Sequence, residues 1–187
     1  MIREYNRKII LEDGQEYYGY AFGDTGDKVC EIVFNTSMVG YQEIVSDPSY
    51  TYQAVVMTYP LIGNYGMADD DYETITPTIG ALIVREYNDE PSNFRSTAAL
   101  SEIMKKYKIP GVYGVDTRKL ARSVRNYGSR KVLITNASTS LEEGLELLKT
   151  YEIPKDAVSC VSCKEGMEFL AETQKYHVVA IDCGMKR

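Results

Sequence analysis

The most reactive side chains in this sequence belong to four cysteines and one histidine: Cys30, Cys160, Cys163, Cys183 and His177. A thiolate attacks an amide only when a base takes its proton and an oxyanion hole stabilises the intermediate. His177 and Cys183 flank an apolar run that predicts a short strand at 178–182. Along a strand their side chains would share a face but lie about 20 Å apart, which excludes a direct pair. We therefore predict that this chain carries no catalytic residue.

Two further groups of residues have the composition of metal sites. Cys160 and Cys163 show C-x-x-C spacing, but no second pair accompanies them. Since a structural zinc ion needs four ligands, we interpret these cysteines as free thiols. The three carboxylates of Asp69–Asp71 are of the type that binds a hard cation, yet consecutive side chains converge poorly, so we interpret them as a solvated turn. The sequence therefore predicts no metal site.

A long polar segment between two strand-like runs is the strongest candidate for a binding loop. The runs lie at 28–34 and 53–59, and the residues between them, Phe34–Tyr50, are mostly uncharged and polar. Two strands need far fewer residues to be joined, and long loops on rigid strands are where binding groups gather. The hydroxyl of Ser49 both donates and accepts hydrogen bonds, which suits an amide or a carboxylate ligand. The residues alone leave a second interpretation open, a serine that serves the turn after Pro48.

The segment Arg118–Lys131 holds six positive charges and no acid, within a chain of net charge −6. Leu120 and Val124 lie four residues apart, which predicts a helix that buries one face and turns its basic residues outward. Two interpretations stay open: a solvated helix face, or a contact for an acidic partner. Nucleic acid is a poor third, because no aromatic pattern accompanies the charges.

The composition is that of an ordinary soluble globular protein. Of the 187 residues, 44% are hydrophobic and 26% are charged, which is enough for one core, or for one domain and part of another. No apolar run approaches the ~20 residues of a membrane helix, and no signal peptide is recognisable at the N-terminus. The net negative charge argues against general binding to nucleic acid or membranes. We therefore expect a cytoplasmic protein with neither kind of partner.

Turn signals and hydrophobic periodicity predict a mixed α/β fold. Strands are expected at 7–12, 16–22, 28–34, 53–59, 79–84, 112–115 and 130–135, and helices from about Thr97, at 118–126 and after Ser140. Asp13-Gly14 predicts a hairpin between the first two strands, Asp116 or Thr117 can cap the helix at 118–126, and Ser140-x-x-Glu143 is a capping box. From Pro154 to Gln174 the pattern weakens to that of a linker. The apolar run at 178–182 then predicts the first strand of a further domain.

Several motifs, in order along the whole chain, resemble the small (glutamine-hydrolysing) subunit of carbamoyl phosphate synthetase. They are F-N-T-S-M-V-G-Y-Q-E at 34–43, D-P-S-Y at 47–50, T-Y-P-L-I-G-N-Y-G at 58–66, S-N-F-R at 92–95, I-P-G-V-Y-G-V-D-T-R-K-L at 109–120 and H-V-V-A-I-D-C-G-M-K-R at 177–187. The resemblance implies an α/β fold with a swivelling β/β/α-type N-terminal domain, which we expect at 1–152. A linker and the first strand of a class I glutamine amidotransferase domain are expected at 153–187.

The resemblance also implies an activity, in which glutamine-derived ammonia, bicarbonate and ATP form carbamoyl phosphate for pyrimidine and arginine synthesis. The family's catalytic cysteine sits in a G-x-C-x-G elbow, and Cys183 does not fit one because residue 181 is isoleucine. The catalytic residues are therefore expected beyond Arg187. By resemblance, Ser49 contacts L-glutamine in the full-length subunit.

The expected partner is the large synthetase subunit, which would carry ATP and Mg, so that no cofactor is expected in this segment. An alternative is a pure interaction module, or a pseudo-subunit without a glutaminase domain.

Overall fold

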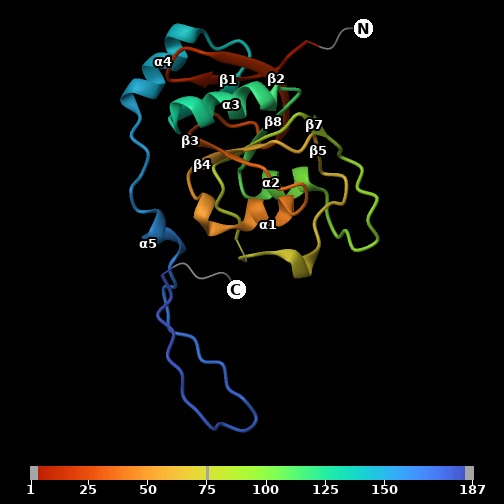
Figure 1. Ribbon diagram of the computed structural model, residues 1–187, viewed down its shortest axis with the longest axis vertical. Coiled ribbons are helices and arrows are strands. Elements are labelled where there is room, and N and C mark those ends of the chain that lie inside the picture. Colours follow the sequence, from red (N-terminus) through yellow and green to blue (C-terminus); the bar gives the residue numbers. More distant parts are fainter. Residues whose placement is uncertain (1–3, 75, 184–187) are drawn as a thin grey trace.

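A computed structural model describes residues 4–74 and 76–183, and within them a closed barrel forms the body of the protein (Figure 1). The strands follow one another around the barrel in the order β1-β2-β8-β6-β4-β3-β9, and β9 pairs with β1 to close it. Their bounds are β1 Arg7–Leu11, β2 Glu16–Gly23, β3 Lys28–Asn35, β4 Gln53–Met57, β6 Ala81–Ile83, β8 Pro110–Tyr113 and β9 Lys131–Asn136. β5 (Leu61–Ile62) and β7 (Glu86–Tyr87) form a separate small sheet. The seven strands expected between residues 7 and 135 and the mixed α/β class are confirmed.

The barrel combines antiparallel and parallel pairing. β1 and β2 form the predicted hairpin, with Lys8 opposite Tyr18. β3, β4, β6 and β8 are instead parallel to one another, with Val33 opposite Val55 in the β3–β4 pair. Parallel neighbours need a long crossover connection, because the chain must return to the starting edge of the sheet. This requirement, which the sequence analysis did not consider, accounts for the length of the segment between β3 and β4.

The helices lie at α1 Tyr41–Ser46, α2 Leu100–Lys106, α3 Thr117–Tyr127, α4 Leu141–Thr150 and α5 Ala157–Val161, with 3-10 turns at Pro48–Tyr50 (η1) and Asp69–Asp71 (η2). Two of the predicted caps are confirmed. The Asp116 carboxylate accepts the backbone N–H of Lys119, and the Ser140 hydroxyl accepts that of Glu143. The expectation of an irregular loop at Phe34–Tyr50 is wrong, because α1 and η1 occupy its second half. Its apolar residues Ile44 and Val45 are buried, a helical signal that the polar residues around them concealed.

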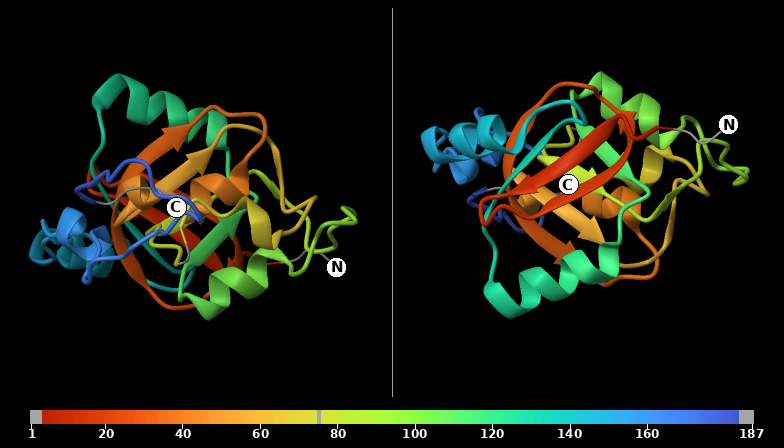
Figure 2. Two further views of the ribbon diagram at one scale, coloured as in Figure 1. Left: turned by 90° about the horizontal axis from the view of Figure 1, so that it is seen from below. Right: turned by 90° about the horizontal axis from the view of Figure 1, so that it is seen from above.

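The hydrophobic core has separate parts, one inside the barrel and others on its outer face. Every barrel strand contributes to one buried cluster, which also contains Leu120 and Val124 of α3. Strand residues alternate between faces with a period of two: Ile32 belongs to the inner cluster, whereas Val33 packs against a second cluster beneath α1 and α2. α4 covers the outer face of β1 and β9 through Leu148. Views along the barrel show α2 and α3 on opposite sides of it (Figure 2).

The chain leaves the barrel after α4 and extends away from it as a long exposed segment (Figure 1). The short helix α5 lies in this segment, and the sequence analysis did not predict it. The strand expected at 178–182 is not present in the structure, where Val178, Val179 and Ile181 are exposed. A strand exists only when a neighbour accepts and donates its backbone hydrogen bonds, and no described segment pairs with these residues.

Candidate functional site

Ser49 lies on the 3-10 turn η1, directly after Pro48, and its side chain is exposed. The Asp47 carboxylate holds this turn by accepting the backbone N–H of Ser49 at 2.9 Å. Thr51 closes it from the other side, because its hydroxyl donates to the carbonyl of Pro48. The backbone of Ser49 therefore serves the turn, while no hydrogen bond joins its hydroxyl to another described residue. That hydroxyl faces solvent on a rigid support.

The support for this turn is a tight contact between α1 and the segment 58–68. The rings of Tyr41 and Tyr65 stack with their centroids 4.0 Å apart. The Tyr65 hydroxyl accepts the backbone N–H of Tyr41 at 2.8 Å, and the Tyr41 hydroxyl donates to the carbonyl of Gly66 at 2.8 Å. Burial raises the pKa of both phenols, so both stay protonated at neutral pH. The stack fixes the first long motif of the sequence against the third.

Gln42 completes this contact. Its side chain is buried and pairs with the backbone of Ala68 in both directions, donating to the carbonyl and accepting the N–H. A buried amide whose donor and acceptor are both satisfied specifies one arrangement, because any shift would leave polar atoms unpaired. Sequence reasoning passed over Tyr41, Gln42 and Tyr65. The sequence offers one signal for these residues: many hydrogen-bonding side chains stand between apolar neighbours there.

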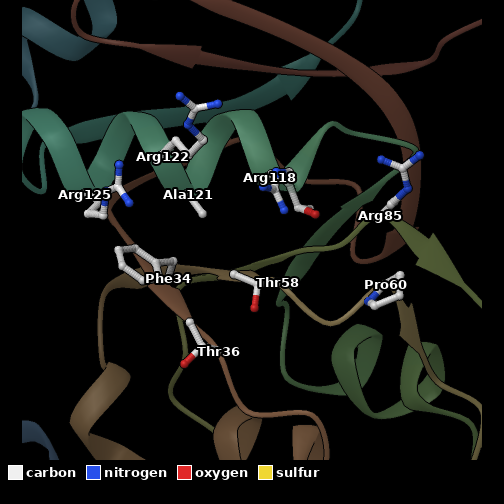
Figure 3. Close-up of a pocket in the computed structure, with 10 residues that line it drawn as sticks. Phe34, Thr36, Thr58, Pro60, Arg85, Arg118, Ala121, Arg122 and Arg125 are labelled. Atoms are coloured by element: carbon white, nitrogen blue, oxygen red, sulfur yellow. The ribbon is translucent and has the colours of Figure 1, made fainter.

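A second site is a groove of about 900 Å³ between α3 and the carboxyl ends of the parallel strands (Figure 3). Four arginines border it, Arg118, Arg122 and Arg125 from α3 and Arg85 from the connection after β6. The groove is also lined by the apolar side chains of Phe34, Pro60 and Ala121 and by three threonines, Thr36, Thr58 and Thr117. We call this feature the arginine groove.

The topology explains why residues so distant in sequence meet there. Parallel strands end at the same edge of a sheet, and the residues that follow them gather at that edge. Thr36 follows β3, Thr58 follows β4, Arg85 follows β6, and α3 follows β8. The backbone N–H of Thr58 donates to the carbonyl of Asn35, which ties the first two of these strand ends together. Three of the motifs quoted above therefore converge on one groove.

The basic segment 118–131 divides into two parts. The side chain of Arg130 is 7% exposed, pairs with Asp13 at 3.1 Å and donates to the Ser123 hydroxyl at 2.6 Å. Lys131 donates to the carbonyls of Leu148 and Tyr151 at the end of α4. These two residues hold the fold together, so the expectation that all six basic residues face outward is wrong.

The arginines of α3 form no ion pair with any residue that the structure describes, and Arg118, Arg122 and Arg125 are all exposed. They are spaced four and three residues apart, so each is a neighbour of the next on the helix surface. Like charges at such spacings destabilise a helix by about 0.2–0.5 kcal/mol per pair. Among the described residues, Arg85 forms an ion pair with Glu86 alone, at 4.0 Å on the surface, where such pairs contribute little.

The cysteines are free thiols, as predicted. Cys30 is fully buried inside the barrel, and burial raises the pKa of its thiol to about 12, which suppresses the reactive thiolate. Cys160, Cys163 and Cys183 are exposed outside the barrel. No hydrogen bond joins His177 to a described cysteine. The predicted strand, which would have held the Cys183 and His177 side chains about 20 Å apart, is not formed in the structure.

The acidic turn η2 is held by protein partners. Arg95 pairs with Asp71 at 2.9 Å, and the Thr97 hydroxyl donates to Asp69 at 2.9 Å. In the parts of the chain that the structure describes, this turn included, no group of three or more His, Cys, Asp or Glu side chains could hold a metal ion. The described helices are also too short or too polar to span a bilayer.

The fold and these two surfaces define a mixed α/β barrel domain with two exposed polar surfaces. Comparison with known proteins gives its family: residues 9–134 match the family model "Carbamoyl-phosphate synthase small chain, CPSase domain". The chain belongs to the carbamoyl phosphate synthase small chain family.

Curated relatives agree with this assignment. The chain is 47% identical over 182 residues to the carbamoyl phosphate synthase small chain of Fusobacterium nucleatum, a match that covers 97% of this chain and 50% of the relative. It is 45% identical over 181 residues to the small chain of Staphylococcus epidermidis, covering 97% of this chain and 49% of the relative. The pyrimidine-specific small chain of Bacillus subtilis is 44% identical over 180 residues, with 96% and 49% covered.

The chain thus spans about half the length of the curated relatives it matches. Among solved structures, an aminopeptidase from Aneurinibacillus sp. strain AM-1 aligns with a TM-score of 0.38 and 17% identity, over 72% of this chain and 30% of that one. That likeness is too low to bear on fold or function.

Proposed function

We propose that this chain is the N-terminal portion of the glutamine-hydrolysing small subunit of a carbamoyl phosphate synthetase. In this proposal the whole subunit releases ammonia from L-glutamine, and the synthetase uses it to make carbamoyl phosphate for pyrimidine and arginine synthesis. The family match over residues 9–134 carries the proposal. The swivelling β/β/α-type domain would occupy residues 1–152, and residues 153–187 would lead into the amidotransferase domain, where segment 178–182 would find a strand to pair with.

The role of this portion in that reaction is to border the glutamine site and to dock on the large subunit. Ser49 is the residue that we assign to the glutamine site. Its exposed hydroxyl on a turn held by Asp47 supports this role, because the side chain is available to a ligand while its backbone is fixed. A hydroxyl in that position matches either the α-carboxylate or the amide of glutamine.

The chemistry itself is assigned to other parts of the enzyme. The catalytic cysteine, histidine and glutamate belong to the amidotransferase domain, and ATP and Mg belong to the large subunit, so this portion needs no cofactor of its own. We propose a cytoplasmic enzyme with neither a nucleic-acid nor a membrane partner. The net charge of −6 supports the absence of a nucleic-acid partner.

The test is to measure glutamine-dependent and ammonia-dependent synthesis with the full-length small subunit and the large subunit. Ser49→Ala is expected to raise the KM for glutamine and to leave the ammonia reaction unchanged, since free ammonia bypasses the glutamine site. Loss of one hydrogen bond to a charged group corresponds to about 1.5–3 kcal/mol, or roughly 10- to 150-fold in kcat/KM.

Ser138→Ala is the matched control, because Ser138 is an exposed serine on a turn at another place on the barrel. A Ser49→Ala enzyme with the same glutamine kinetics as the Ser138→Ala enzyme would remove Ser49 from the site. A wild-type complex that makes carbamoyl phosphate from neither nitrogen source would contradict the proposed function as a whole.

A further inference from the structure

We infer that the arginine groove is the docking site for an acidic polypeptide segment of the large synthetase subunit. This inference rests on the proposed function and makes it specific, because it names one surface of this chain and the chemistry of its partner. Within the basic segment 118–131, the contact with the partner is assigned to the arginines of α3. Arg130 and Lys131 are excluded, since both are bound within the domain.

The shape of the groove favours an extended ligand. Arg118, Arg122 and Arg125 follow one side of α3, and seven residues of helix correspond to about 10 Å. Arg85 continues the row from a different element, so the four arginines follow one another along the groove, with the guanidinium of Arg122 turned away from Phe34 and Thr58 (Figure 3). A single phosphate or carboxylate ion is too small to contact a row of this length. An elongated chain with several carboxylates matches it.

The charge of the groove favours an acidic partner. Within the described part of the chain, Arg118, Arg122 and Arg125 have no carboxylate partner, although the protein as a whole is acidic. Neighbouring guanidinium groups repel one another along the helix, and opposite charges brought by a partner would relieve that repulsion. Arginine also binds carboxylates through two parallel hydrogen bonds, which adds geometric specificity to the attraction.

The apolar part of the lining favours a polypeptide over a small anion. Phe34, Pro60 and Ala121 lie among the charges, and they offer nothing to a bare anion. They suit the methylene groups and apolar side chains that a polypeptide carries between its carboxylates. Nucleic acid fits less well, because one partly buried ring does not make a stacking platform and the net charge of −6 repels a phosphate backbone.

The test is a binding titration between the purified large subunit and the full-length small subunit at several salt concentrations. The groove variant combines Arg122→Glu with Arg125→Glu. It is expected to bind at least about tenfold more weakly, and with a shallower dependence on salt, because attraction between opposite charges is replaced by repulsion. Arg122→Gln with Arg125→Gln is a milder second variant, since glutamine retains the helix propensity of arginine.

The matched control is Lys105→Glu with Lys106→Glu. It reverses two exposed charges at the end of α2, on the opposite side of the barrel (Figure 2). The control is expected to bind within about twofold of the wild type, because only the general charge of the subunit has changed. Thermal unfolding of each variant checks that the barrel is intact.

The outcomes separate this inference from the proposed function. If wild type binds and supports glutamine-dependent synthesis but both groove variants bind as tightly as the control, the docking site lies elsewhere and only the inference fails. Equal weakening of groove variants and control would also overturn it, since the effect would then be one of net charge. If inorganic phosphate binds the groove while large-subunit affinity is insensitive to Arg122 and Arg125, the groove is a small-anion site instead. A wild-type subunit that does not bind the large subunit at all contradicts the proposed function as well.

Discussion

The phenolic oxygen of Tyr52 lies 3.2 Å from Oδ1 of Asp156, a residue 104 positions later in the chain. The same hydroxyl lies 3.2 Å from Sγ of Cys160 on α5. Tyr52 is three residues beyond Ser49 and adopts a left-handed backbone conformation with φ of 63°. This contact connects the segment that leaves the barrel to the turn that carries Ser49. It therefore bears on how a following domain would be oriented relative to Ser49.

Tyr52→Phe is expected to release α5 from the barrel, because the mutation removes the hydroxyl and leaves the ring. Amide hydrogen exchange of residues 156–162 is expected to become faster, while exchange in the barrel strands stays unchanged. Tyr127→Phe is the control, since Tyr127 is 75% exposed at the end of α3. Unchanged exchange in α5 of the Tyr52→Phe protein would show that the contact does not hold this helix.

Gly19→Ala is expected to destabilise the barrel. A Cβ atom at this position of β2 would lie 2.4 Å from the carbonyl oxygen of Tyr113 on β8, so the two paired strands would have to separate. Overpacking of this kind costs about 1–3 kcal/mol, which urea unfolding followed by circular dichroism would measure. Gly166→Ala is the control, because its Cβ would meet nothing within 4 Å and its φ is not positive. Equal unfolding midpoints for the two variants would contradict the barrel geometry.

Arg130→Met is expected to lower the free energy of unfolding by about 1–3 kcal/mol, because it removes the ion pair between the nearly buried Arg130 side chain and the exposed Asp13 carboxylate and leaves the Ser123 hydroxyl without its donor. Arg125→Met, at an exposed arginine of the same segment, is expected to change stability by less than about 0.5 kcal/mol. Chemical denaturation measures both. Similar effects at the two positions would show that the segment does not divide into structural and free arginines.

The 187-residue chain by itself is expected not to hydrolyse glutamine. Amide hydrolysis by a thiol needs a cysteine, a base and an oxyanion hole held to within about half an ångström. Cys30 is sealed inside the barrel, and the other cysteines lie on an exposed segment without a hydrogen-bonded histidine among the described residues. The measurement is ammonia release, together with mass spectrometry after exposure to a glutamine-derived electrophile. A stoichiometric adduct on one cysteine that glutamine protects would reveal an active site.

Several local elements and the family could be predicted from the sequence. Asp13-Gly14, Asp116 and Ser140 act through backbone groups a few residues away, so the hairpin and the two helix starts could be predicted from their spacing. The motif resemblance gave the small-subunit family, which the comparisons confirm. It also pointed to Ser49, whose assignment to the glutamine site stays a prediction.

Tertiary structure alone decided the parallel order of β3, β4, β6 and β8 and the groove at their carboxyl ends. Strand order depends on contacts between residues far apart in the chain, which no local pattern records. The same reason explains why some residues of the basic segment are exposed and others are bound within the domain. Arg125 and Arg130 look alike in sequence, but one faces the groove, while the other meets Asp13 because the barrel closes and brings β9 beside β1.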